Sequence, residues 1–362
     1  MLREMETSKL LVVMSMVLVV VLCALAIIYM SQHTSSGTAD FSEIERANSK
    51  LEKFKVYFLG WVVHYSPTST STYYKHHDKF TWVSPTWYEV DWNGNVIEVH
   101  YNEEFVRKSR EWGVKILPLV ANRAFDRKTV HRILSTPDLR RKVVKQLIEI
   151  VLKREYDGIN IDFENIPPED RAYLTEFMRE FYETFKQYGK IVSIDVAAKT
   201  SETYTGWSGA YDYGGLAKYC DLFIIMIYDY HYSGGSPGPI SPLEWFERVL
   251  DYALSKVPRE KIVAGIPFYG YDWPVGGRGK GVTYSQAIRL AELYGAKVRF
   301  DWESGEATFS YVVSGVRHEV WFNIAKSTEL RIKLALRKGV NKIAAWRVGQ
   351  EDPLTWTVIA RP

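Results

Sequence analysis

One short segment contains carboxylates at a spacing that a single strand would bring onto one face. Residues 157–164 read DGINIDFE. Because side chains alternate along a strand, Asn160, Asp162 and Glu164 share one face and the apolar residues share the other. Two neighbouring carboxylates repel each other and raise the pKa of one, so a protonated glutamic acid can donate to a leaving group. The segment predicts general acid catalysis by Glu164. The alternative is a buried ionic network that only organises the fold.

The strand that carries these carboxylates is one of eight short apolar runs that alternate with longer helical patterns. The runs are apolar on both faces, which is typical of parallel strands buried on both sides. Eight such strands predict an α/β fold, a (β/α)8 TIM barrel, whose catalytic groups lie at the carboxyl ends of the strands. A doubly wound sheet is the alternative. The strands are expected at 56–63, 80–84, 114–120, 158–163, 191–197, 222–228, 262–268 and 343–346.

The connection between the seventh and eighth strands is much longer than the others. It contains a helical pattern at 284–294 and strand-like runs at 297–302, 307–313 and 317–322. We therefore expect a small α+β insertion at about residues 271–325, on the catalytic face of the barrel.

The N-terminal region predicts a membrane anchor. Residues 10–30 form an uncharged apolar run that is long enough to span a bilayer as a helix. The basic residues Arg3 and Lys9 precede the run, which places residues 1–9 in the cytoplasm and the rest of the chain outside. Residues 31–50 are expected to be a polar linker and 51–362 the barrel. This arrangement predicts a single-pass cell-membrane protein. The alternative is a signal peptide cleaved after Ala26, which gives a secreted protein.

Composition narrows the possible functions. Hydrophobic residues make up 46% and charged residues 25% of the 362 residues, which is the balance of a globular protein. A net charge of +3 without a basic run argues against a nucleic-acid partner. The two cysteines and the spacing of the histidines predict no metal site, and no glycine pattern indicates a nucleotide cofactor. We therefore expect no cofactor.

Several motifs together carry a resemblance to a known family. The pattern Asp157-Gly-x-x-x-Asp162-x-Glu164 resembles the signature of glycoside hydrolase family 18, which contains chitinases and N-acetylglucosaminidases on (β/α)8 barrels. The segment Met-Ile-Tyr228-Asp229 and the pair Ala-Trp346 are similar to motifs that end the sixth and eighth strands of that family. The segments that begin at residues 209, 226, 266 and 346 resemble the spore-cortex and spore-germination branch most closely. Together, the resemblance covers residues 55–358.

The sequence departs from this pattern at two places. Asn160 stands where chitinases of the family usually carry Asp, although this branch often has Asn. An apolar segment precedes the barrel where spore enzymes typically carry peptidoglycan-binding modules.

The resemblance implies retaining, substrate-assisted hydrolysis of β-glycosidic bonds in N-acetylglucosamine-containing glycans, such as chitin, peptidoglycan or surface glycans. It implies that Glu164 is the general acid and then the base. It also implies that Asp162 holds the acetamido N–H, that Asp157 lies behind Asp162 and shares its proton, and that Tyr228 donates to the acetamido oxygen. A catalytically inactive, lectin-like barrel is the alternative. Family lectins typically lose the glutamate or its aspartate partner, and both are present here.

A second group of residues is expected to bind the glycan, although each of them could instead be structural. The resemblance implies that Asp229 contacts the −1 sugar and that Trp346 forms its floor. Asn122 ends the third predicted strand, His231 follows the Tyr-Asp pair, and Asn160 shares the face of the carboxylates. Two of five further tryptophans are expected to be sugar platforms; the five are Trp61, Trp87, Trp207, Trp273 and Trp321.

Overall fold

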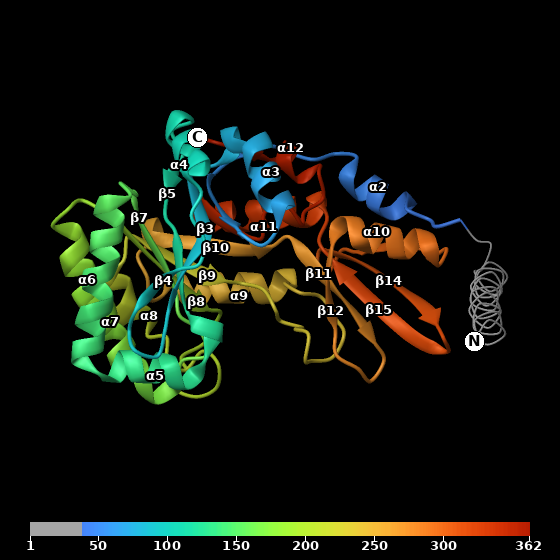
Figure 1. Cartoon of the computed structure of the whole chain (residues 1–362). Coiled ribbons are helices and arrows are strands. Elements are labelled where there is room, and N and C mark those ends of the chain that lie inside the picture. Colours follow the sequence, from blue (N-terminus) through green and yellow to red (C-terminus); the bar gives the residue numbers. More distant parts are fainter. Residues whose placement is uncertain (1–37) are drawn as a thin grey trace, which may run out of the picture.

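The computed structural model describes residues 38–362, and its centre is a closed barrel (Figure 1). In this part of the chain, eight parallel strands follow one another around the barrel, and pairing of the first with the second closes the ring. The TIM barrel is therefore confirmed and the doubly wound sheet is wrong. In ring order, the strands are β2 (Tyr57–Val62), β16 (Lys342–Trp346), β10 (Ile262–Pro267), β9 (Leu222–Met226), β8 (Ile191–Ala197), β7 (Gly158–Asp162), β6 (Leu119–Asn122) and β3 (Trp82–Val90).

Short strands extend or flank this ring. β5 (Lys115–Ile116) pairs with β3 just before β6, and β4 (Val96–Glu98) runs antiparallel to the far part of β3. β1 (Phe54–Lys55) pairs with β17 (Ile359–Ala360), which ties the start of the barrel to its end.

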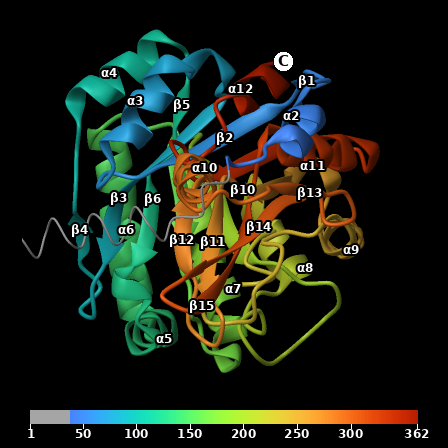
Figure 2. The same ribbon diagram turned by 90° about the vertical axis from the view of Figure 1, so that its right-hand side faces the viewer.

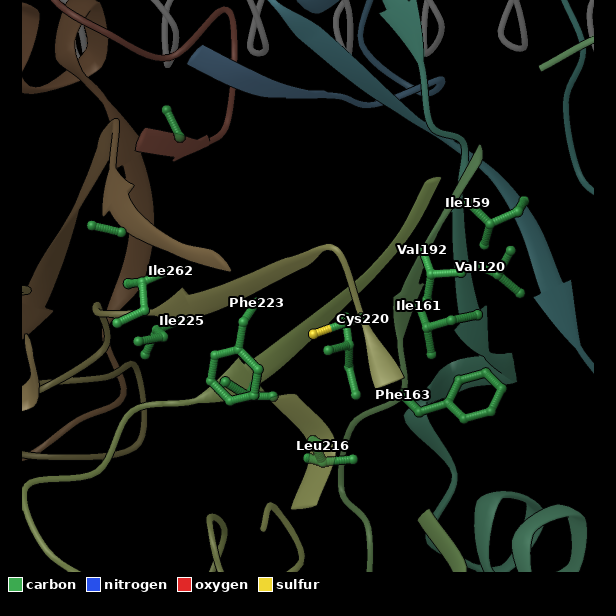
Figure 3. Packing of buried hydrophobic residues seen from close by; sticks show 14 of the residues in the cluster. Val120, Ile159, Ile161, Phe163, Val192, Leu216, Cys220, Phe223, Ile225 and Ile262 are labelled. Carbon is green, nitrogen blue, oxygen red and sulfur yellow. The ribbon is translucent and has the colours of Figure 1, made fainter. Parts of the chain in front are cut away.

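Helices cover the outside of the ring because the outward faces of the strands are apolar (Figures 1 and 2). On β7 and just beyond it, Ile159, Ile161 and Phe163 are buried in a large cluster with residues of the neighbouring strands and helices (Figure 3). Complete burial of each such side chain contributes about 1.5–3 kcal/mol. The helices are α3 (Pro67–Lys75), α4 (Glu103–Glu111), α5 (Arg127–Ser135), α6 (Pro137–Lys153), α7 (Arg171–Lys186), α8 (Tyr213–Leu216), α9 (Leu243–Leu254), α11 (Ala325–Arg337) and α12 (Thr355–Val358).

The insertion follows the carboxyl end of β10 and forms its own antiparallel sheet (Figure 2). Its helix α10 (Tyr284–Leu293) packs on this sheet, and the two share a separate apolar core. The strands are β11 (Tyr269–Pro274), β12 (Lys280–Thr283), β13 (Arg299–Asp301), β14 (Glu306–Val313) and β15 (Val316–Phe322), in the order β12-β11-β15-β14-β13. The sheet begins at residue 269, close to the expected 271.

A buried ion pair fastens the insertion to the barrel. The guanidinium of Arg331 on α11 donates to Glu306 on β14 at 2.5 Å and to the carbonyl of Ser241. The carboxylate of Glu306 also accepts the backbone N–H groups of Ile240 at 2.8 Å and Ser241 at 2.7 Å. Because every charge has several partners, the insertion is held in one position relative to the strand ends.

Part of the predicted linker is folded. Helix α2 (Ser42–Asn48) lies inside the range 31–50 and packs on the insertion, with Ile44 and Ala47 buried in its core. The spacing of Phe41, Ile44 and Ala47 gives this short helix one apolar face, which the linker prediction overlooked. The predicted membrane anchor at 10–30 and the tail at 1–9 lie outside the described residues. From residue 38 onward, the helices are all too short or too polar to cross a bilayer.

Candidate active site

A cleft of about 520 Å³ opens at the carboxyl ends of the barrel strands. Five of the predicted residues line it or its mouth: Asp162, Glu164, Tyr228, Asp229 and Trp346. They come from the ends of β7, β9 and β16, which meet at one end of the barrel although they are far apart in the sequence. The structure thus brings together the carboxylates and aromatic residues that the sequence pattern singled out.

A third buried carboxylate lies beside Asp162. The register of β7 and β8 pairs Ile161 with Ile194, so the next residues, Asp162 and Asp195, lie at the same level of neighbouring strands. Such strands are about 4.8 Å apart. Both side chains line the cleft and are almost fully buried, with 5% and 2% exposure.

This arrangement sets the protonation of the pair. Burial raises the pKa of Asp162 well above its usual value, and the charge of Asp195 raises it further. Burial likewise raises the pKa of Asp195, whereas a hydrogen bond from Asn160 opposes the rise. Two like charges at this separation in a buried site are unfavourable, so ionisation of one carboxyl group opposes ionisation of the other and the pair shares a proton.

Asn160 orients Asp195 from below the cleft. Its amide Nδ2 donates to Asp195 Oδ1 at 2.9 Å. Its Oδ1 accepts from Trp61 Nε1 at 2.9 Å and from Ser84 Oγ at 3.0 Å, so both ends of the amide are fixed. The donated hydrogen bond favours the ionised form of Asp195 and leaves the shared proton on Asp162. In agreement with this direction, Asp162 Oδ1 is buried without a hydrogen-bond partner in the described structure.

Glu164 follows the last residue of β7 and is held by its backbone. Its N–H donates to Asn122 Oδ1 at 2.9 Å, and its carbonyl accepts from Asn122 Nδ2 at 3.2 Å. The preceding carbonyl of Phe163 accepts from the hydroxyl of Tyr211 at 2.9 Å. Burial, followed by the charges of Asp162 and Asp229, raises the pKa of Glu164 well above its usual value. The side chain is therefore a positioned acid whose protonated form is favoured by its surroundings.

Two tyrosines from the insertion hold Asp229. The hydroxyls of Tyr269 and Tyr271 on β11 donate to Asp229 Oδ1 at 2.5 and 3.1 Å. The backbone of Asp229 has a φ of 60°, in the left-handed region that is uncommon for non-glycine residues and that aspartate adopts more readily than most. The adjacent Tyr228 lines the cleft, and within the described residues its hydroxyl makes no hydrogen bond. Burial raises the pKa of Tyr228 well above its usual value, so the hydroxyl is a neutral donor.

Aromatic side chains form the floor of the cleft. Trp346 at the end of β16 meets Trp61 on β2 edge to face, with ring centroids 5.8 Å apart. Trp346 offers flat apolar surface to the C–H face of a sugar, whereas Trp61 is 1% exposed and packs against Trp346. Of the five candidate platforms, only Trp61 lines this cleft. Trp87 and Trp273 are buried in the apolar core, with 2% and 0% exposure.

Four predicted site residues have other roles in this structure. Asp157 precedes β7 at the opposite end of the strand, where its carboxylate accepts the N–H of Ile116 at 2.8 Å; Asp195, not Asp157, adjoins Asp162. Asn122 is 1% exposed, and its side-chain amide forms hydrogen bonds with the backbone N–H and carbonyl of Glu164. It therefore positions Glu164 rather than a sugar. Asn160 is fully buried.

His231 lies outside the set of residues that line the cleft. Its Nδ1 is 2.9 Å from the carbonyl of Ser236 within the same loop, which indicates a structural role.

The sequence analysis missed Asp195, although a signal was present. In the strand Ile191–Ala197, Asp195 is a lone carboxylate in an apolar run, two residues after Ser193 and on the same inward face. No group of three or more His, Cys, Asp or Glu side chains in residues 38–362 is arranged to hold a metal ion.

Comparison with known proteins places these features in a family. The model of glycosyl hydrolases family 18 matches residues 49–351. The cortical fragment-lytic enzyme of Bacillus subtilis (strain 168) is 31% identical over 252 residues, which are 68% of this chain and 58% of that enzyme. The uncharacterized glycosylase YvbX of the same organism is 29% identical, over 83% of this chain and 91% of its own length.

Two solved structures are similar to this chain over most of its length. The Bacillus cereus spore cortex-lytic enzyme SleL has a TM-score of 0.78 and 25% identity, over 85% of this chain and 74% of its own chain. A chitinase from Chromobacterium violaceum also has a TM-score of 0.78 and 25% identity, over 83% of this chain and 97% of its own.

The crowded carboxylates predict a stability that falls as pH rises. A carboxyl group whose pKa is higher in the folded than in the unfolded chain stabilises the fold below its unfolded pKa, and this contribution is lost as pH rises through the folded pKa. Asp195→Asn removes one charge of the pair and keeps the shape that accepts from Asn160. We expect it to raise the free energy of unfolding at pH 8 by about 1 kcal/mol or more, with little effect at pH 4.

Chemical denaturation at the two pH values measures this difference. Asp138→Asn, which changes an exposed carboxylate, is the control and should leave the pH dependence unchanged. An equal effect of Asp195→Asn at both pH values contradicts the prediction.

Proposed function

The chain belongs to glycosyl hydrolases family 18 and is a glycoside hydrolase, and on this premise we propose that it cleaves β-glycosides of N-acetylglucosamine with help from the substrate's own acetamido group. The observation that carries the proposal is the arrangement at the end of β7. A partly buried acid, Glu164, lies next to an unpartnered oxygen of Asp162, and the free hydroxyl of Tyr228 faces the same cleft.

Glu164 begins the reaction as the acid. Its proton moves to the glycosidic oxygen as the bond from the anomeric carbon to that oxygen breaks. The carbonyl oxygen of the acetamido group attacks the anomeric carbon from the other face and closes an oxazolinium ring. Water then attacks the anomeric carbon, its proton moves to Glu164, and the configuration is retained.

The position of Asp162 argues for this route and against a protein nucleophile. Asp162 is the last residue of β7 and Glu164 lies two residues beyond the strand, so Asp162 lies deeper in the barrel. It therefore approaches the sugar from the same side as the acid rather than from the opposite face of the anomeric carbon. An acetamido N–H suits the unpartnered Asp162 Oδ1 once the shared proton moves to Asp195. The positive charge of the oxazolinium strengthens this contact.

Tyr228 completes the binding of the acetamido group. Its neutral hydroxyl can donate to the acetamido oxygen and direct it toward the anomeric carbon. Asp229, fixed by the tyrosines of β11, is placed to contact the same sugar, and Trp346 lies beneath it. A sugar-binding barrel without turnover is the second candidate. The retained Glu164 and Asp162 favour the enzyme, and hydrolysis of an N-acetylglucosamine β-glycoside separates the two.

The relatives bear on the choice of glycan. Their names refer to cortical fragments and to chitin, and we propose an N-acetylglucosamine-containing polymer or oligosaccharide of one of these kinds as the substrate. This chain spans 58% of the length of the cortical fragment-lytic enzyme of B. subtilis.

Replacement of the acid gives the first test. Glu164→Gln should lower kcat about 10²–10⁴-fold, because the amide cannot protonate the leaving oxygen. Binding of a chitin oligomer should persist, since the shape of the site is kept. Steady-state kinetics on an unactivated oligosaccharide measure the loss, and Glu169→Gln, at an exposed carboxylate in the short 3-10 helix Pro168–Asp170, serves as the control. A Glu164→Gln enzyme that keeps more than about a tenth of its kcat refutes the assignment.

The acetamido group itself gives the second test. The enzyme should cleave 2-acetamido glycosides and leave matching glucosides and deacetylated glucosaminides intact. Asp162→Asn and Tyr228→Phe should each lower kcat more than they raise KM, because both contacts strengthen as the oxazolinium forms. A thiazoline analogue of that ring should inhibit tightly. Comparable turnover of the glucoside, or a sugar bound covalently to Asp162, rules out this mechanism.

Residues 10–30 support one proposal about location. We propose that this apolar run anchors the chain in the cell membrane with the barrel outside. The full-length protein should stay with the membranes through a carbonate wash, and a chain that begins near Thr38, ahead of helix α2, should be soluble and active. A mature protein whose N-terminus follows Ala26 shows secretion instead.

A further inference from the structure

One cation stands apart in an otherwise acidic cleft. Among the described residues that line the cleft, Arg347 is the only lysine or arginine. The lining includes the carboxylates of Glu89, Asp162, Glu164, Asp195 and Asp229. An arginine in such surroundings would be expected to pair with one of them.

The guanidinium of Arg347 nevertheless makes no hydrogen bond and no ion pair within residues 38–362. Its Nη1 is buried without a hydrogen bond, and its guanidinium lies over the ring of Tyr65, 5.4 Å from the centroid. The nearby Glu351 does not pair with it. That carboxylate accepts from the N–H groups of Gly349 and Gln350 at 2.7 and 3.1 Å and from Trp356 Nε1 at 3.1 Å.

The order of the strands places this cation far from the acid. Arg347 follows β16, which lies four strands from β7 in either direction around the barrel. Arg347 and Glu164 therefore stand on opposite walls of the cleft, with the ring of Trp346 on the floor. A glycan that places one sugar on Trp346 beside Glu164 extends its neighbouring sugar along the walls of the cleft.

The chemistry of the guanidinium indicates what it binds. Its planar array of N–H donors matches the two oxygens of a carboxylate, and leaving a buried donor unpaired is costly. The carboxylates elsewhere in the cleft would repel an anion, so an anionic group fits only near Arg347. We propose that Arg347 binds a carboxylate on a sugar of the substrate, which makes the preferred glycan an N-acetylglucosamine polymer with acidic sugars. This inference rests on the proposed function and narrows its substrate class.

Two kinds of sugar carry such a carboxylate. In one it belongs to a lactyl ether, as in N-acetylmuramic acid, and in the other it is the C6 acid of a uronic acid. A substrate panel distinguishes them: a neutral chitin oligomer, a peptide-free glycan alternating N-acetylglucosamine with N-acetylmuramic acid, the same glycan with its lactyl groups amidated, and a glycan alternating N-acetylglucosamine with glucuronic acid.

The test compares Arg347→Gln with the unaltered enzyme on this panel. Loss of a charge-assisted pair should lower kcat/KM about 10–100-fold on the acidic glycan that the enzyme prefers. The effect on the neutral oligomer and on the amidated glycan should be less than about threefold, because neither offers a charge. Arg347→Lys should restore part of the activity on the acidic glycan. Equal losses on neutral and acidic substrates would overturn the proposal.

A binding measurement separates this inference from the proposed function. Calorimetry with the Glu164→Gln protein measures affinity for each glycan of the panel without turnover. Adding Arg347→Gln should weaken binding of an acidic glycan alone. If the unaltered protein hydrolyses nothing on the panel, the proposed function fails, and the calorimetric comparison still decides the role of Arg347. Unchanged affinity for both acidic glycans after Arg347→Gln rejects that role.

Discussion

The site depends on three carboxyl groups that lie close together and are shielded from water. Asp162 and Asp195 share one level of neighbouring strands, and Glu164 lies one step above them. Burial raises the pKa of all three carboxyl groups. The charge of Asp195 adds to the rise at Asp162, the charge of Asp162 adds to it at Glu164, and the charge of Glu164 adds to it at Asp195. Asn160 stabilises this arrangement because its amide donates a hydrogen bond to Asp195. Asn160 is itself fixed by a hydrogen bond from Trp61. The carboxyl end of an otherwise apolar barrel thus carries Glu164 as an acid that resists ionisation.

The insertion supplies what the barrel strands lack. Asp229 comes from the barrel, but the hydroxyls that hold it come from Tyr269 and Tyr271 on β11. The position of β11 is fixed in turn because the ion pair between Arg331 and Glu306 fastens the insertion to α11. Replacing one member of this pair would leave an unpaired buried charge and disturb the cleft from a distance. The insertion is therefore part of the site rather than an appendage.

The sequence predicted the parts that local rules govern. Apolar runs gave the barrel, and strand alternation together with the family motif gave Glu164 and Asp162. Asp195 escaped because its relation to Asp162 depends on the register between two strands, which periodicity along one strand does not contain. Asn122 was misassigned for the same reason, since only the folded chain shows its amide bound to the backbone of Glu164. Helix α2 was missed because its apolar face is only two turns long and becomes buried on a distant insertion.

The separation of charges across the cleft follows from the needs of the acid. A cation beside Glu164 would favour its ionised form and lower its pKa, which would remove the proton that the reaction requires. Burial and the charge of Asp229 favour the protonated form of Glu164, and Asp162 does so whenever its carboxyl group is ionised. Arg347 lies four strands away, where it leaves this balance undisturbed and still faces the same cleft. The proposed acid catalysis and the proposed recognition of an anionic sugar are compatible in one barrel because opposite walls carry them.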